Sequence, residues 1–286
     1  MAGESGRFRY RKRFGQHFLI NGHIADRIVE SASLGSEDTV LEIGPGKGIL
    51  TERIIRKVRA VYAVEIDRDL AEMLRERFGK EEKFHLVEHD ILKLDLNELI
   101  RGVSPRIKVV SNIPYYISSP IIELLINNRT IVSDAVLMVQ KEVARRLLAE
   151  PGSKDYGLTT LNLALCAEGS KLMDVKPGSF KPPPEVMSSV ISLVFNEKYR
   201  FPIANKHIFH IITGVAFRQR RKMVRNTLIP YFVSQGVTES AAMNLLLSAG
   251  ISPFVRPETI TTDSFVKLSN AFAEIQTSGY GPETRQ

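Results

Sequence analysis

One short segment combines residue types suited to chemistry on an amino group. It reads Ser111-Asn112-Ile113-Pro114-Tyr115-Tyr116 and follows an apolar run. The amide oxygen of Asn112 can accept a hydrogen bond, the carbonyl of Ile113 or Pro114 can add a second acceptor, and the ring of Tyr115 can stack on a base. Acceptors at the N–H groups of an exocyclic amine turn its delocalised lone pair toward an electrophile. The segment is predicted to orient a nucleobase amine; the alternative is an Asn-x-Pro turn with tyrosines in the core.

A second segment is typical of a loop that binds a nucleoside. Gly44-Pro45-Gly46-Lys47-Gly48 follows one apolar run and precedes a helical pattern, and closely spaced glycines let the backbone approach a ligand. Glu65 ends the next predicted strand, where an acid can accept hydrogen bonds from ribose hydroxyls. Asp90 ends the third, where it can accept one from an adenine amino group. The alternative is a tight turn accompanied by two solvated acids.

The glycine loop favours S-adenosylmethionine over a dinucleotide. Its spacing departs from G-x-G-x-x-G at Ile49, and Pro45 removes a backbone N–H that a pyrophosphate would use. S-adenosylmethionine carries no phosphate and does not need that donor. An NAD-dependent oxidoreductase remains the rival interpretation.

Short apolar runs that alternate with helical patterns must position these residues. This alternation predicts an α/β fold, a Rossmann-like domain with a parallel sheet and helices on both faces. Two later strand-like runs, Lys171–Val175 and Val190–Phe195, could form an antiparallel edge. The five runs predicted to form the parallel strands are Val40–Ile43, Ala60–Ile66, Phe84–Val87, Ile107–Ser111 and Ala135–Val139.

The pattern changes near residue 200, after which it is helical only. We therefore predict a methyltransferase domain over residues 1–200, with a basic arm at 1–20, and a smaller all-helical domain over residues 201–286 that positions RNA. The predicted helices of the second domain are Lys206–Phe217, Arg221–Phe232, Glu239–Ala249 and Ser264–Ile275.

Composition restricts the class of protein. A net charge of +7 and a pI near 9.4 favour a polyanionic partner. Cys166 is the sole cysteine, which excludes an intrachain disulfide and a cysteine-based zinc site, and no metal is expected. We see no secretory signal and no run long enough to span a membrane, so we expect a cytoplasmic protein if the source is bacterial.

Two basic segments are candidates for contact with RNA. The first is the arm Arg7–Arg13, which contains Arg11 and Arg13. The second lies in the helical domain and contains no acid; at helical spacing four of its cations would share one face and form a track for phosphates. An ordinary solvated face is the alternative. The four cations are Arg218, Arg221, Lys222 and Arg225.

These motifs together resemble the ribosomal RNA adenine N6-dimethyltransferases. Asn-Ile-Pro-Tyr and Leu-Glu-Ile-Gly-Pro-Gly-Lys-Gly carry the resemblance, and four further segments agree with it. The last of the four resembles the small-subunit branch of the family. The four are Arg11–Leu19 (RKRFGQHFL), Gln140–Ala144 (QKEVA), Phe180–Val186 (FKPPPEV) and Ala216–Lys222 (AFRQRRK).

The resemblance implies a reaction and a partner. The reaction is the S-adenosylmethionine-dependent dimethylation of N6 on two adjacent adenosines, in a hairpin loop near the 3′ end of small-subunit (16S) ribosomal RNA. The implied partner is a pre-30S ribosomal subunit, the implied role lies in small-subunit biogenesis, and a monomer is expected. The alternatives are a large-subunit (23S) methyltransferase of the erythromycin-resistance type and a non-catalytic ribosome-assembly factor.

The resemblance also implies roles for individual residues. His17, where the family commonly has Asn, and Leu19 would contact the methionine end of the cofactor. Tyr115 and Phe180 would sandwich the target adenine, and Tyr116 stands where Asn is frequent. The catalytic set is then Asn112, Pro114, Tyr115 and Phe180. The cofactor set is His17, Leu19, Gly44, Gly46, Glu65 for the ribose, Asp90 for the adenine amino group, and Asn112.

Overall fold

The computed structural model describes residues 17–102 and 106–277. The basic arm with Arg11 and Arg13 lies outside these residues. The chain divides into two compact units: the first runs to Ala144 and includes Gly169–Phe195, and the second combines Arg145–Glu168 with the chain from Asn196 onwards. The sequence-based boundary at residue 200 differs from this division in the segment Arg145–Glu168, and the boundaries of the functional domains remain a prediction.

The first unit is built on one seven-stranded sheet. Five strands are parallel and β9 runs antiparallel to β6. The order of the strands reverses between β2 and β5, so their carboxyl ends flank the crevice where open α/β sheets bind ligands. In spatial order the strands are β4 (Phe84–Glu88), β3 (Ala60–Glu65), β2 (Thr39–Ile43), β5 (Ile107–Asn112), β6 (Val132–Gln140), β9 (Ser188–Phe195) and β7 (Ala167–Val175).

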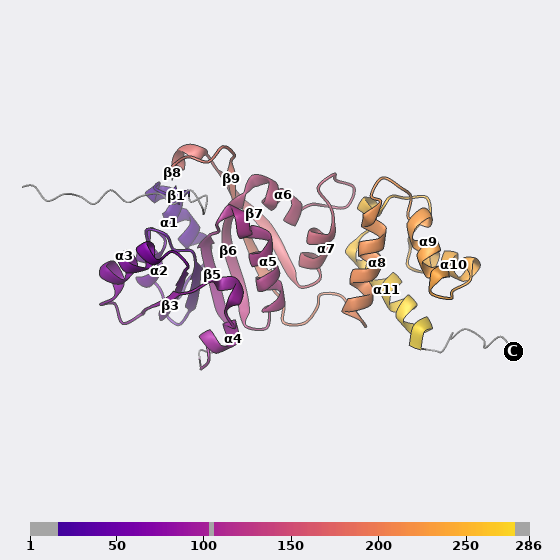
Figure 1. Ribbon diagram of the computed structural model, residues 1–286, viewed down its shortest axis with the longest axis horizontal. Coiled ribbons are helices and arrows are strands. Elements are labelled where there is room, and N and C mark those ends of the chain that lie inside the picture. The colour runs from indigo at the N-terminus through magenta and orange to yellow at the C-terminus, as the bar shows by residue number, and fades with distance from the viewer. Residues whose placement is uncertain (1–16, 103–105, 278–286) are drawn as a thin grey trace, which may run out of the picture. The chain divides into compact units, whose positions relative to one another are not determined.

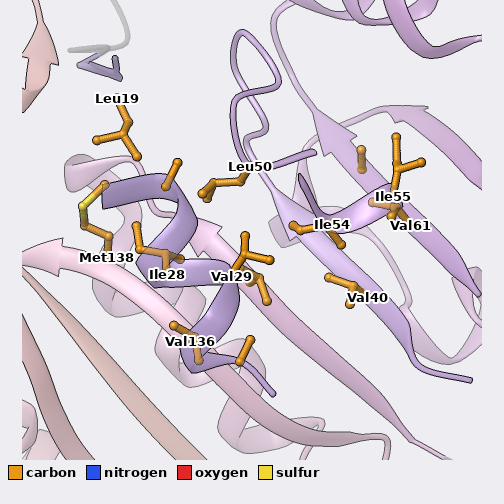
Figure 2. Close-up of a cluster of buried hydrophobic side chains, with 14 of the residues drawn as sticks. Leu19, Ile28, Val29, Val40, Leu50, Ile54, Ile55, Val61, Val136 and Met138 are labelled. Carbon is orange, nitrogen blue, oxygen red and sulfur yellow. The ribbon is translucent and has the colours of Figure 1, made fainter. Parts of the chain in front are cut away.

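Helices cover this sheet because its central strands are apolar on both faces. Every residue of β2 is buried, as expected for a parallel strand packed between two layers. Figure 2 shows Ile28 and Val29 of α1 packed beside Val136 and Met138 of β6. The helices are α1 (Gly22–Ser31), α2 (Thr51–Ile55), α3 (Arg68–Phe78), α4 (Leu96–Leu99), α5 (Ser118–Asn127) and α6 (Lys141–Leu147), which crosses the boundary between the units.

A two-stranded sheet joins the start of the described chain to a distant segment. Strand β1 (Phe18–Leu19) pairs antiparallel with β8 (Phe180–Lys181), with Leu19 opposite Phe180. Both of these side chains are buried in the hydrophobic core of the first unit. The pairing therefore holds β1 in the first unit, the one that contains the parallel sheet.

The second unit is helical and has its own aromatic core. Phe209, Phe232, Phe265 and Phe272 are fully buried, and the ring centroids of Phe232 and Phe272 lie 4.8 Å apart. Burial of such rings stabilises a small unit through their large apolar area. In Figure 1, α8, α9 and α10 are orange and α11 is yellow. The helices are α7 (Leu158–Ala164), α8 (Lys206–Arg218), α9 (Arg225–Ser234), α10 (Glu239–Ser248) and α11 (Thr262–Thr277).

The predicted fold class is confirmed, and two expected helices were wrong at their starts. The helix predicted to follow the glycine loop directly begins only at Thr51, as α2, because residues 46–50 form turns in which Gly48 has φ 78°. The helix predicted from Arg221 begins at Arg225, because residues 219–222 form a turn after α8. No helix among the described residues is long and apolar enough to cross a membrane.

Candidate cofactor and substrate site

A cavity of about 200 Å³ opens at the carboxyl ends of the parallel strands in the first unit. Three groups of residues predicted from the sequence line it: the glycine loop after β2, the acids after β3 and β4, and the segment after β5. The residues of β1 complete its wall. The predicted residues that line it are His17, Leu19, Gly44, Gly46, Glu65, Asp90, Asn112, Pro114 and Tyr115.

The glycine loop needs glycine where its backbone turns toward the cavity. Gly44 and Gly46 have φ values of 64° and 60°, a region that other residues rarely adopt. A Cβ on Gly46 would lie 3.0 Å from the ring of Phe18. The Lys47 ammonium lies 5.2 Å from the centroid of the same ring. Strand β1 therefore packs directly on the loop, and only a glycine leaves room for it.

Glu65 is buried beside the loop and is held by backbone donors. One carboxylate oxygen accepts hydrogen bonds from the N–H groups of Ile66 and Asp67, at 2.9 and 3.0 Å. The other accepts one from Gly46, at 3.2 Å. Burial raises the pKa of Glu65, and these three donors oppose that shift. A carboxylate has about four lone-pair sites, so roughly one remains, on the oxygen that Gly46 contacts.

Glu42 is a second buried acid in the cavity wall, and the sequence analysis did not assign it a role. Its side chain is 1 % exposed and accepts a hydrogen bond from the Thr51 hydroxyl at 2.6 Å. Burial raises its pKa to about 8, against the hydrogen bonds from Thr51. Glu42 precedes the glycine loop and Thr51 follows it. This contact closes the loop at its base with a carboxyl group that is protonated at neutral pH.

Asp90 lies at a more open part of the wall. It caps the short helical turn Ile91–Lys93 by accepting a hydrogen bond from the N–H of Leu92 at 3.1 Å. Its side chain is 28 % exposed. Tyr116 lines the cavity near both Asp90 and Glu65; burial, and then the charges of these two acids, raise the pKa of its hydroxyl.

Asn112 is oriented by a single contact. Its Nδ2 donates a hydrogen bond to the backbone carbonyl of His17 at 3.3 Å. Because a carbonyl only accepts, the amide nitrogen must face His17, and Oδ1 is directed elsewhere. The structure thus presents the side-chain oxygen Oδ1 of Asn112 as a hydrogen-bond acceptor at the end of β5. This orientation depends on His17, the residue that precedes β1, being part of the cavity wall.

The residues after Asn112 form a turn that fixes Tyr115. The Pro114 carbonyl accepts hydrogen bonds from the N–H of Ile117 and the hydroxyl of Ser118, at 3.2 and 3.4 Å. The Tyr115 hydroxyl contacts the Ser188 hydroxyl at 2.6 Å, and the Tyr115 ring centroid lies 5.5 Å from that of His17. The Pro114 carbonyl is already engaged, so the geometry favours Ile113 as the source of a second acceptor.

The structure brings most of the predicted residues together but places Phe180 differently. Phe180 is 3 % exposed, lies in β8 opposite Leu19, and is not among the described residues that line the cavity. His17 is held by its Nδ1, which lies 2.9 Å from the carbonyl of Pro182. The sandwich of Tyr115 and Phe180 around a base remains a prediction and would require Phe180 to become accessible.

The four basic residues of the second unit were expected to share one helix face, and the structure does not place them on one helix. Arg218 ends α8, Arg221 and Lys222 lie in the turn that follows, and Arg225 begins α9. All four are exposed. Arg220 differs from them, because its guanidinium donates to the Ser153 carbonyl at 3.2 Å and lies 3.9 Å from Glu258. The correction leaves a basic turn in place of a helical track, and its contact with RNA stays a prediction.

Sequence reasoning missed two residues that shape the cavity. The signal for Glu42 was present, since an acid inside an otherwise apolar strand must be neutral or paired. Ser188, which contacts the Tyr115 hydroxyl, gave no signal. It lies in β9, far along the chain, and only the assembled sheet brings it near.

Comparison with known proteins identifies the family of the chain. The family model of ribosomal RNA adenine dimethylases matches residues 7–273. A relative from Pseudomonas putida, named ribosomal RNA small subunit methyltransferase A, is 38% identical over 96% of this chain and 98% of its own.

Two solved structures share the fold. A dimethyladenosine transferase from Plasmodium falciparum superposes with a TM-score of 0.74 at 28% identity, covering 90% of this chain and 98% of its own. The 23S rRNA methyltransferase ErmE superposes with a TM-score of 0.68 at 24% identity, covering 90% and 99%, and shows the likeness of fold alone. From the family match and the full-length relative together, the chain belongs to the ribosomal RNA adenine dimethylase family.

Proposed function

We propose that this protein uses S-adenosylmethionine to dimethylate N6 of two adjacent adenosines, in a hairpin loop near the 3′ end of small-subunit ribosomal RNA. Family membership and the small-subunit relative support the reaction and the RNA. The observation that carries the proposal is the cavity, where the glycine loop, two acids and the Asn112–Tyr115 segment meet at one edge of the sheet.

The described residues fit the cofactor. The backbone at Gly44 and Gly46 forms a wall without side chains, and Glu65 keeps an acceptor site there for a ribose hydroxyl. Asp90, on the more open side, would accept from the adenine amino group, and His17 and Leu19 would lie at the methionine end. When bound, S-adenosylmethionine supplies an electrophilic methyl group.

The protein's own part in the reaction is orientation. In the first transfer Asn112 Oδ1 and the carbonyl of Ile113 each accept a hydrogen bond from one N–H group of N6, and the lone pair of N6 turns toward the methyl group. In the second transfer the one remaining N–H group is held by one of these two acceptors. The Tyr115 ring stacks on the base, and its bond to Ser188 holds that ring at one angle. No general base is required, because the methylated amine is acidic enough to lose its proton to water. Such preorganised polar groups contribute about 2.7–4 kcal/mol to a transition state.

Mass spectrometry of small- and large-subunit ribosomal RNA, after incubation with protein and labelled S-adenosylmethionine, tests the proposal. We expect N6,N6-dimethyladenosine at two adjacent positions of the small-subunit RNA. Label in the large-subunit RNA would support the erythromycin-resistance type of activity instead. RNA binding without label in either would support a non-catalytic assembly factor.

A further inference from the structure

An exposed aromatic side chain lies beside the basic turn of the second unit, on the segment that follows α10. Phe254 is 60 % exposed, the largest exposed fraction among the large hydrophobic residues of the described chain. The guanidinium carbon of Arg225 lies 4.6 Å from the centroid of its ring. An arginine placed over an exposed ring leaves the rest of that ring open to a second flat group.

Two loops hold this pair in place. The N–H of Val224 donates to the Val255 carbonyl at 2.9 Å, and the N–H of Arg225 donates to the Pro253 carbonyl at 3.2 Å. Val224 is fully buried in the core of the second unit. The backbone on both sides of Phe254 is therefore fixed to the start of α9. The ring is presented by a rigid support and would lose little conformational entropy on binding.

The surroundings of the pair are positive. Arg220 forms a salt bridge with Glu258. Within the described chain, no carboxylate forms a salt bridge with the exposed cations of the segments next to Phe254. Cations that form no salt bridge and lie on segments next to an exposed aromatic ring suit a single-stranded nucleic acid, because the charges can contact phosphates while the ring stacks on a base. These exposed cations are Arg218, Arg221, Lys222, Arg225 and Arg256.

We propose that Phe254 and Arg225 form a stacking platform for an unpaired nucleotide of small-subunit ribosomal RNA, separate from the adenosines that are methylated. The inference rests on the proposed function for the identity of the RNA. It adds a base contact to a surface that would otherwise recognise phosphates alone. A protein partner would not require stacking, and the tests below separate the two.

Binding of protein-free small-subunit ribosomal RNA to Phe254 variants is the first test. Phe254→Ala should weaken binding about 5- to 150-fold, the range expected for one lost base stack. The slope of log K on log salt should stay unchanged, since no charge is removed. Phe254→Trp should bind as wild type and Phe254→Leu should not. Thermal unfolding of each variant controls for folding.

Fluorescence gives a direct readout because the chain contains no tryptophan. The single indole of Phe254→Trp should be quenched on addition of the RNA. Val233→Trp is the matched control: Val233 is 45 % exposed and lies on the same helix as Arg225, roughly 12 Å along its axis, and should stay bright.

Three results would overturn the platform. They are binding by Phe254→Ala within twofold of wild type, full binding by Phe254→Leu, and a loss of affinity that appears only with intact subunits, which would indicate a protein contact. Failure of the proposed function is distinguishable from these results. It appears as a wild-type protein that transfers no methyl group to small-subunit RNA, whatever the behaviour of Phe254.

Discussion

The cavity of the first unit and the basic turn of the second use polar residues in opposite ways. In the cavity each polar side chain has a partner: Glu65 has three backbone donors, Glu42 has Thr51, and Asn112 has the carbonyl of His17. On the turn, Arg221 and Lys222 are exposed and face solvent. Fixed groups suit chemistry, which depends on position, and exposed charges suit affinity, which depends on number.

The largest expected effect is on the rate of methyl transfer. Asn112→Ala should lower the single-turnover rate roughly 100–1,000-fold, because an oriented acceptor matters most in the transition state. RNA affinity should change only a few-fold, since many phosphate contacts supply it. Rates are measured with protein saturated in S-adenosylmethionine.

The control for this variant is Asn97→Ala, the same substitution on exposed α4, which should have no effect on the rate. A rate for Asn112→Ala within a few-fold of wild type would contradict the comparison between fixed polar groups in the cavity and exposed charges on the turn. The segment would then be a structural turn.

The next effect concerns the cofactor. Glu65→Ala should weaken S-adenosylmethionine binding about 10- to 150-fold, the equivalent of about 1.5–3 kcal/mol for hydrogen bonds to a charged group. It should also lower thermal stability, because three backbone N–H groups lose their acceptor. Asp90→Ala should weaken binding with a smaller loss of stability, since Asp90 accepts one backbone N–H. Calorimetric titration with wild-type affinity in both variants would contradict the assigned site.

A third prediction concerns pH and Glu42. Its pKa of about 8 in the folded protein lies above the ordinary 4.5, so the folded state holds a proton that the unfolded chain loses. This contribution to stability is complete below pH 4.5 and is lost as the pH rises toward 8. Glu42→Gln, which cannot ionise, should therefore gain stability relative to wild type between about pH 5 and 8, on the order of 3–4 kcal/mol. Denaturant unfolding at several pH values would show it; a difference independent of pH would refute the neutral carboxyl group.

The smallest effect tests the basic turn with neighbouring arginines. Arg221→Ala should lower the slope of log K on log salt for RNA binding by roughly one, with no change in stability. Arg220→Ala should instead lower stability with little change in slope, because Arg220 contacts Ser153 and Glu258 within its own unit. Equal salt slopes in the two variants would make the turn an ordinary solvated surface.

The sequence predicted the parallel strands, which short-range patterns of apolar residues and turns determine. The predicted parallel strands fall within a few residues of those observed, because their apolar runs and the turns that end them are short-range signals. Glu65, Asp90 and Asn112 reached one cavity because each follows a parallel strand, and such strands end at the same edge.

What the sequence did not predict depends on long-range contacts. The helix predicted from Arg221 begins only at Arg225, and the contacts around the intervening turn are distant in the chain: Arg220 bonds to Ser153, and Val224 pairs with Val255. The burial of Phe180 follows from its pairing with Leu19, which no local pattern encodes. The sequence therefore predicted which motif a side chain belongs to more reliably than whether that side chain is buried or exposed.

The pairing of β1 with β8 has a consequence for how the protein is made. His17 contacts the carbonyl of Pro182, a residue 165 positions later in the chain. At about 5–20 residues per second, a ribosome needs roughly 10–30 s to synthesise that interval. Until then the cavity lacks the partner strand that fixes β1, and Asn112 lacks the carbonyl that orients it. A growing chain thus acquires its glycine loop early and its oriented acceptor only after Pro182 has been synthesised, so methyl transfer should require a chain that extends beyond β8.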